Sequence, residues 1–347
     1  MNTPARAQIA SARIGVMPHT ILPGPAKAGP YWEAVESTAT VPLVSLDDIR
    51  AAANRIRHLA VRTPLLEVRG LGLKCENFQP SGAFKIRGAC NMLAQLASDA
   101  RKAGVITYSS GNHGLSVALV ARAMGMHAVI VMPENAPRVK VDHVREHGAE
   151  VIFAGTTSAD RHARAESQAA ARGLTIVPPF DHPWIIAGAG TVGLEILEQR
   201  PQTRTIYVPM GGGGQISGVS AAVKRMRDGV RVIGVEPAGA ARMSASLAAG
   251  HAVTLDRAES IADGLLTLRP GDVTFAHVQA FVDRVVTVDD AEMTAAVKWL
   301  FREARVVAEP SGAAAVAAAL KEGESAAVAV ISGGNVDPVA YARYVTM

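Results

Sequence analysis

Cysteine and aromatic residues are scarce in this chain of 347 residues, and their scarcity excludes several classes of protein. Its two cysteines, Cys75 and Cys90, are too few for a disulfide scaffold and lack the spacing of a metal site. Phe, Trp and Tyr make up only 4% of the residues and are not interleaved with a basic stripe, so we expect no nucleic-acid partner. We therefore predict free, buried cysteines in a protein of a reducing compartment, the cytoplasm.

Long apolar runs and an excess of one charge are also absent. No segment reaches the roughly 18 consecutive apolar residues of a membrane helix, so we expect no membrane partner. The 35 basic and 31 acidic residues are scattered and leave a net charge of only +4. A hydrophobic content of 49% is typical of a globular protein, and the length suits two domains of ordinary size.

Short β-branched runs alternate with helical stretches from residue 100 onward. Val105–Tyr108 and Ala128–Met132 predict strands, and Leu115–Met124 predicts the helix between them. This alternation, with short connections, favours parallel sheets with helices on both faces. Further predicted strands are 151–153, 175–177, 205–208, 232–236, 284–288 and 327–331, and further predicted helices are 139–146, 160–171 and 216–226.

Lys85, in Ser81-Gly82-Ala83-Phe84-Lys85, is the most informative residue of the chain. A lysine in apolar, glycine-flanked surroundings should have a lowered pKa, which leaves its amine free to attack an aldehyde carbon. Taken alone, the segment could equally be the solvated edge of an amphipathic helix. Three further motifs favour the reactive amine, namely Ser109-Ser110-Gly111-Asn112-His113, Gly211-Gly212-Gly213-Gly214 and Ser332-Gly333-Gly334-Asn335.

The glycine run Gly211–Gly214 follows a predicted strand and precedes a predicted helix. Glycine amides at a helix N-terminus can point together at an anion such as phosphate. No Lys-Ser or Lys-Thr follows, which excludes a nucleotide P-loop, and the acidic residue of a dinucleotide loop is lacking. A tight turn is the alternative, but a turn does not require the conformational entropy that four glycines cost. The run therefore predicts a phosphate site.

In this order the four motifs resemble those of the fold-type-II pyridoxal-phosphate enzymes, in particular the serine/threonine dehydratase and serine racemase family. The resemblance runs from about Val44 to Val336. It implies an α/β fold of two doubly wound parallel-sheet domains, similar to the tryptophan synthase β subunit, with the smaller inserted into the larger. We expect an N-terminal extension over 1–40, a large cofactor-binding domain over 41–100 and 186–347, and a small substrate-loop domain over 101–185.

The resemblance implies pyridoxal 5′-phosphate as the cofactor and assigns a role to each motif. Lys85, beside Phe84, would hold the cofactor and act in catalysis, and the run of Gly211, Gly212, Gly213 and Gly214 would hold its phosphate. Asn112 would bind its 3′-hydroxyl, Ser332 its pyridine nitrogen, and Glu309 would line the pocket. The loop that would bind the substrate α-carboxylate consists of Ser109, Ser110, Gly111, Asn112 and His113.

Plainer interpretations of these residues stay open. Asn112 could cap a helix, Ser332 could be a turn residue, and Glu309 could cap the helix that begins near Ser311. We interpret His113 as a packed loop histidine and not as an acid or base.

The implied function is a threonine/serine-type ammonia-lyase, or dehydratase, of amino-acid catabolism. It would convert a β-hydroxy amino acid to a 2-keto acid and ammonia by α,β-elimination, because a serine does not keep the pyridine nitrogen protonated as an aspartate would. Two alternatives stay open. A serine racemase-like enzyme with side dehydratase activity is one, because Ser110 matches the second base of the racemases. A pyridoxal-phosphate-binding protein without turnover is the other. We expect a homodimer that acts on a small amino-acid substrate.

Departures from the family pattern concern the substrate and the metal. Ala83 and Ala189 stand where the family has serine and glutamine, which bears on substrate choice. Eukaryotic-type racemases have a glutamate, a backbone carbonyl and an aspartate around a divalent cation; the corresponding residues here are Glu236, Ala240 and Arg242. An arginine brings positive charge and removes an oxygen ligand, so we expect no metal. Arg242 would either replace the cation or face solvent.

Overall fold

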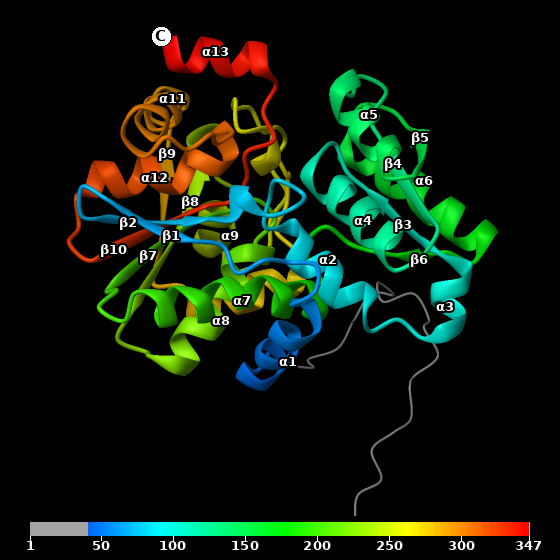
Figure 1. The fold of residues 1–347 in the computed structure, drawn as a ribbon, viewed down its shortest axis with the longest axis horizontal. Helices are drawn as coiled ribbons and strands as arrows, with labels where there is room; N and C mark the ends of the chain where they lie inside the picture. The colour runs from blue at the N-terminus through cyan, green and yellow to red at the C-terminus, as the bar shows by residue number, and fades with distance from the viewer. Residues whose placement is uncertain (1–40, 347) are drawn as a thin grey trace, which may run out of the picture. The chain divides into compact units, whose positions relative to one another are not determined.

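The computed structural model describes residues 41–346, and every structural statement below concerns this part of the chain. Its strands form two sheets, one of six strands and one of four (Figure 1). No helix within residues 41–346 is long and apolar enough to cross a bilayer. The extension predicted over residues 1–40 lies outside the described residues.

The larger sheet consists of six strands, which are β1 (Leu65–Val68), β2 (Leu71–Cys75), β7 (Thr205–Pro209), β8 (Arg231–Pro237), β9 (Arg284–Val288) and β10 (Ala327–Ile331). Their order in space is β1-β2-β10-β7-β8-β9. All neighbours pair in parallel except β1 and β2, which are antiparallel. Every residue of β2, β7 and β10 is buried, as expected for parallel strands covered on both faces.

Helices cover both faces of the larger sheet. The principal ones are α7 (Pro183–Gln199), α8 (Gly214–Met226), α10 (Asp272–Phe281), α11 (Asp290–Trp299) and α12 (Pro310–Glu322). Along β10, Ala329 and Ile331 pack in one core with α11 and α12. The alternate residues Val328 and Val330 pack in another core with α7, α8 and α10. The period of two along the strand therefore gives each face its own core.

The smaller sheet lies between β2 and β7 in the chain. Its elements are β3 (Val105–Tyr108), α4 (Asn112–Ala123), β4 (Ala128–Met132), α5 (Arg138–Glu146), β5 (Glu150–Phe153), α6 (Ser158–Arg172) and β6 (Thr175–Ile176). The strands are all parallel, in the order β5-β4-β3-β6. Ile130 packs with α4 and α5 on one face, and Val131 packs with Ala165 of α6 on the other. Both sheets are thus doubly wound, which confirms the predicted fold class.

The remaining elements join or flank the two sheets. They are the helices α1 (Leu46–Ile56), α2 (Lys85–Leu93), α3 (Ser98–Ala103), α9 (Arg242–Ala249) and α13 (Pro338–Thr346), the 3-10 turns η1 (Glu76–Phe78), η2 (Ala238–Ala240) and η3 (Asp263–Leu265), and the π-helix η4 (Leu300–Ala304). Each predicted strand forms, with ends shifted by at most one residue. The domain limits at residues 100 and 185 stay predictions.

Cys75 and Cys90 are free and buried, as predicted. Burial raises the pKa of the Cys75 thiol to about 12 and that of Cys90 to about 11. A thiol with so high a pKa is not a nucleophile near neutral pH. Both cysteines therefore contribute packing to β2 and α2.

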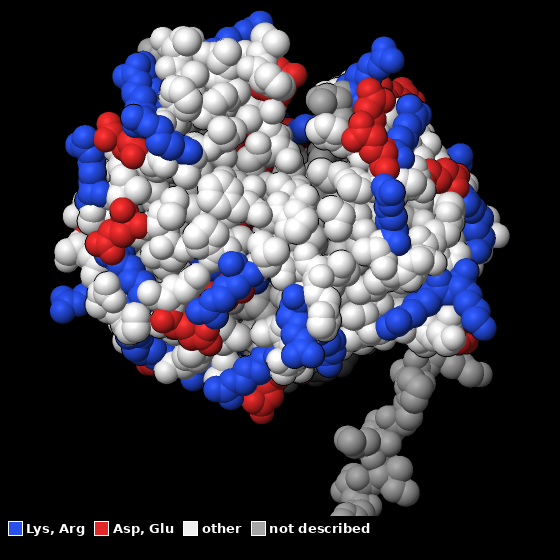
Figure 2. Space-filling view, viewed as in Figure 1, with Lys and Arg blue, Asp and Glu red and all other residues white. Residues whose placement is uncertain are grey.

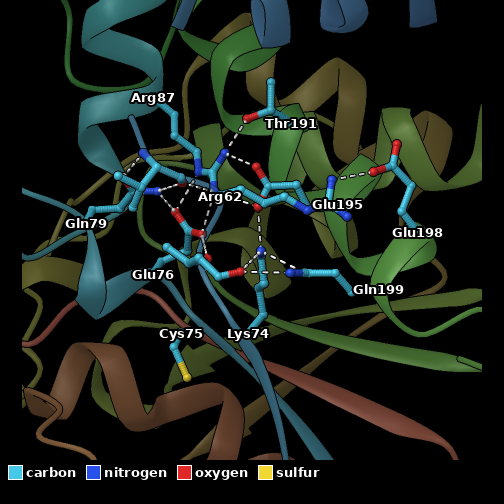
Figure 3. A network of polar contacts seen from close by, with 12 residues as sticks. Arg62, Lys74, Cys75, Glu76, Gln79, Arg87, Thr191, Glu195, Glu198 and Gln199 are labelled. Atoms are coloured by element: carbon cyan, nitrogen blue, oxygen red, sulfur yellow. Dashed lines mark hydrogen bonds and ion pairs between the residues drawn. The ribbon is translucent and has the colours of Figure 1, made fainter. Parts of the chain in front are cut away.

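A buried network of charges fastens α2 to the larger sheet (Figure 3). Arg87 of α2 donates from Nε to Oε2 of Glu76 at 2.7 Å and from Nη1 to Oε1 of Glu195, on α7, at 2.7 Å. The buried ammonium of Lys74, on β2, pairs with the other oxygen of Glu195. Burial would raise the pKa of Glu76, but Arg87 keeps it below its usual range. Two cations and two carboxylates thus balance in the interior.

Neutral side chains complete this network. Thr63 donates to Glu76 at 2.6 Å, and Arg87 donates to Thr191 of α7 at 3.0 Å. Gln79 bridges Glu76 and the backbone of Val61. Because every member is hydrogen-bonded, the network satisfies the condition for burying charge at tolerable cost. Arg87 stands two residues after Lys85, so the network fixes the helix end from which Lys85 projects.

Replacing Arg87→Met should destabilise the protein by about 3–5 kcal/mol, because the buried carboxylate of Glu76 loses its partner. The matched control is Arg62→Met, since Arg62 pairs at 2.5 Å with Glu198 and both side chains are 52% exposed. That change should cost at most about 1 kcal/mol. Urea unfolding of both variants measures the difference. Equal midpoints would contradict the structural role given to the network.

Candidate active site

Lys85 begins α2 and is held by the linker that follows β6. Its Nζ donates to the backbone carbonyl of Pro179 at 2.6 Å and lies 5.2 Å from the centroid of the Phe84 ring. Burial lowers the pKa of the Lys85 amine to about 8. The uncharged fraction of the amine near neutral pH is therefore larger than for an exposed lysine, which favours a nucleophilic role.

The Lys85 and Ser332 motifs run side by side. The amide of Phe84 donates to the carbonyl of Ser332 at 3.0 Å, and the amide of Gly334 donates to the carbonyl of Gly82 at 2.9 Å. Gly82 has a φ of 70°, in the region that favours glycine, and a Cβ there would overlap the side chain of Asn335. Ser332, at the carboxyl end of β10, is thereby placed beside the segment that carries Lys85.

Asn112 ties the third motif to the same place. Its Nδ2 donates to Oε1 of Glu309 at 2.6 Å, and its Oδ1 accepts from Nδ2 of Asn335 at 2.8 Å. Asn112 is the first residue of α4 and does not cap it. Its amide has a second N–H, which no described residue engages. That donor is available to a ligand.

Glu309 occupies the N-cap position of α12, but its side chain does not cap the helix. It turns to Asn112, and a Cβ on Gly333 would overlap its Oε1. Burial, with a smaller contribution from Asp263, raises the pKa of Glu309 to about 8. The carboxyl is therefore mostly protonated at neutral pH, and this residue adds no full negative charge to the surroundings of Ser332.

The predicted loop from Ser109 to His113 follows β3 and includes the first two residues of α4, Asn112 and His113. Ser109 Oγ accepts from the amide of Gly111 at 3.1 Å, which closes the loop. The ring of His113 is buried, its Nε2 lies 3.1 Å from the carbonyl of Val177, and burial lowers its pKa to about 3. His113 is thus a neutral packed residue, as predicted. Ser110 is half-buried, and its hydroxyl makes no hydrogen bond to any residue within 41–346.

The glycine run lies between β7 and the N-terminus of α8. Within residues 41–346, the amides of Gly211, Gly212 and Gly213 find no acceptor. A Cβ on Gly212 would lie 2.5 Å from the ring of Phe180, and Gly213 has a φ of 100°. Three free donors beside the positive end of a helix form an anion site that larger residues could not build.

Phe180 follows Pro179, so the residue that contacts the glycine run is adjacent to the one that accepts from Lys85. The structure therefore brings all four sequence motifs to one place. The sequence indicates a crossover near Pro179 but does not reveal its contacts with the site, because Pro179 contributes only a carbonyl and Phe180 only a packed ring. Contacts of a backbone carbonyl or of a packed ring do not produce a recognisable sequence motif.

Comparison with known proteins identifies the class. The family described as "Pyridoxal-phosphate dependent enzyme" matches residues 56–333, and the chain belongs to it. It is 42% identical to an L-threonine ammonia-lyase of Thermotoga maritima over 85% of this chain and 76% of that one. It is 39% identical to a serine racemase of Schizosaccharomyces pombe over 88% and 98%. Maize serine racemase superposes with a TM-score of 0.83 at 38% identity, covering 87% and 97%.

The residues present fit pyridoxal 5′-phosphate. Lys85 offers an amine for its aldehyde, and the free amides of the glycine run offer donors for its phosphate. Ser332 offers a hydroxyl for the pyridine nitrogen, and Asn112 offers an N–H for the 3′-hydroxyl. The sequence-predicted site residues therefore form one donor set of the right chemistry.

Arg242 is fully buried, so the interpretation that it faces solvent is wrong. Its guanidinium donates to the carbonyls of Ala240 at 2.8 Å, Leu265 at 2.7 Å and Met210 at 2.9 Å. It lies 3.8 Å from Oε1 of Glu236. It thus supplies a fixed positive charge between Glu236 and the Ala240 carbonyl. Met210 directly precedes the glycine run, so the hydrogen bond from Arg242 to its carbonyl helps to hold the start of that run in place.

Since a guanidinium fills this position, chelation should have no effect. We expect EDTA to leave both the melting temperature and the visible absorption of the bound cofactor unchanged. No cluster of three or more His, Cys, Asp or Glu side chains suited to a metal occurs within residues 41–346. A fall in melting temperature with EDTA that Mg²⁺ reverses would show a cation site built from other ligands.

Proposed function

We propose that this enzyme is a threonine/serine-type ammonia-lyase, which eliminates the hydroxyl of a β-hydroxy amino acid and yields a 2-keto acid and ammonia. The observation that carries the proposal is that the segment bearing the buried Lys85 amine is hydrogen-bonded through its backbone to the Ser332 segment. Glu309, which is mostly protonated near neutral pH, is in turn bonded through its amide to the carbonyl of Gly333. Without an ionised carboxylate for the pyridine nitrogen, elimination is favoured over transamination. The name of the Thermotoga maritima relative supports the same reaction.

The residues of this chain have distinct tasks in that reaction. The bound cofactor supplies an electron sink that makes the substrate Cα proton acidic. Lys85, whose pKa is about 8, accepts that proton at Nζ, since a base is most efficient when its pKa lies near the working pH. The amides of the Ser109–His113 loop hold the substrate carboxylate. The buried network around Arg87 keeps Lys85 in position.

We also propose the setting in which the enzyme works. Two free thiols suit the cytoplasm, and the reaction suits amino-acid catabolism. Exposed apolar side chains support a homodimer, among them Phe301, Val307 and Val339. Acidic and basic side chains are mixed over the face in Figure 2 and form no continuous basic stripe, in keeping with a small-molecule substrate. The segment 101–185 would be the small domain that carries the substrate loop.

Product analysis tests the reaction directly. The purified protein, loaded with cofactor, should release ammonia and a 2-keto acid in equal amounts from at least one of L-serine, L-threonine, L-threo-3-hydroxyaspartate and phenylserine. Lys85→Ala should lower the rate at least about 100-fold, as expected for loss of a general base. Cofactor binding without ammonia from any of the four would favour the binding protein without turnover.

Ser110 separates the lyase from the racemase. If its unengaged hydroxyl is a second base, Ser110→Ala should lower conversion of L- to D-serine at least about 100-fold while L-serine elimination stays within a few-fold. The matched control is Ser109→Ala, which loses the bond to Gly111 and should affect both reactions alike. Chiral chromatography measures the D-isomer. If the wild type neither forms nor consumes D-serine, the racemase alternative falls.

A further inference from the structure

An ion pair between Lys140 and Asp263 links α5, which flanks the smaller sheet, to η3 near the candidate site. Lys140, on α5, places its Nζ 2.5 Å from Oδ2 of Asp263, on η3. The lysine side chain is 22% exposed and the aspartate 51%, so the pair is accessible to solutes. Figure 2 shows the surface hollowed between the parts that carry α5 and α13.

Lys140 borders the loop that would bind the substrate. A Cβ on Gly111 would lie 3.4 Å from Lys140 Nζ, and the three atoms closest to that position all belong to Lys140. Its ammonium therefore stands over the Ser109–His113 loop. A further anionic group on a substrate whose α-carboxylate is held by the loop amides would meet this charge.

Asp263, the partner of Lys140, belongs to a segment that contacts the glycine run and α12. The next residue, Gly264, donates its amide to Ser311 Oγ at 2.9 Å, and a Cβ on Gly211 would lie 3.3 Å from the Gly264 carbonyl. η3 is thus packed between α12 and the glycine run. Asp263 also raises the pKa of the buried Glu309, whereas Lys140 lowers it. Both charges therefore act on the interior of the site.

We propose that the Lys140–Asp263 pair determines the substrate class: Asp263 neutralises Lys140 and so favours β-hydroxy amino acids with an uncharged side chain over those with a second carboxylate. The inference rests on the proposed function, because it takes the Ser109–His113 loop as the substrate loop. A second carboxylate would have to displace Asp263 from Lys140 and would then face an unpaired like charge.

Asp263→Asn should unmask Lys140. The variant keeps the size of the side chain but removes both the competitor and the repulsion, so a side-chain carboxylate gains an ion pair. Because the pair is partly exposed, the new attraction and the relieved repulsion are each modest. We therefore expect the preference for L-threo-3-hydroxyaspartate over L-serine to rise about tenfold, which corresponds to about 1.4 kcal/mol.

The experiment compares the cofactor-loaded wild type with Asp263→Asn, Lys140→Met and the double variant. Dissociation constants for the two amino acids are read from the change in visible absorption on binding, and kcat/KM from ammonia release. The gain of Asp263→Asn should disappear in the double variant, because it depends on the Lys140 charge. It should also shrink as salt is added.

The matched controls are Lys224→Met and Asp283→Asn. These residues form a 2.8 Å ion pair, and Lys224 lies ten residues beyond the start of α8, about 15 Å along the helix from the glycine run. They should leave the preference unchanged.

Two results would overturn the inference. One is an unchanged preference in Asp263→Asn, and the other is an equal shift for both amino acids, which would make the pair a structural link only. Failure of the proposed function has a different signature. In that case both amino acids bind and no 2-keto acid forms, while the ratio of dissociation constants still decides the role of the pair.

Discussion

The pairing of Arg87 with Glu76 and Glu195 is the interaction on which the site depends. It joins α2, η1 and α7 through charges that are fully or largely buried, and Lys74 balances the remaining carboxylate oxygen. Buried charges contribute little net stability but tolerate only one arrangement of their partners. The position of α2, and hence of Lys85 at its first residue, is therefore tightly specified. The side chain of a lysine is flexible, so its backbone must be held in place if its amine is to reach a bound ligand reproducibly.

Around Lys85, burial shifts the pKa values of three ionisable side chains in the direction that favours their uncharged forms. Burial lowers the pKa of Lys85 to about 8 and that of His113 to about 3, and it raises the pKa of Glu309 to about 8. Glu309 and His113 are thus mostly uncharged near neutral pH before a ligand binds, and the Lys85 amine loses its proton more readily than that of an exposed lysine. The permanent positive charge of Arg242 and the free glycine amides lie at one end, where an anion would bind. An interior without a full negative charge from Glu309, next to an anion site at the glycine run, suits a ligand with an aromatic ring and a phosphate.

Much of this arrangement could be predicted from the sequence because it follows chain order. Parallel strands end at one edge of a sheet, so motifs that follow neighbouring strands meet there, as Gly211 after β7 and Ser332 after β10 do. Helix starts were less predictable, since α4 begins at Asn112 and not at the first apolar residue, Leu115. The contacts of Pro179 and Phe180 were not predictable. They involve a carbonyl and a ring brought together from distant segments, and the burial of Arg242 runs against the usual exposure of arginine.

The central claim is that the Lys85 amine is the group that bonds the cofactor. Borohydride reduction of the loaded protein, followed by proteolysis and mass spectrometry, tests it most directly. We expect one modified peptide, which contains Lys85, and loss of the visible absorption band. Cofactor fixed to another lysine, such as Lys74 or Lys140, would contradict it.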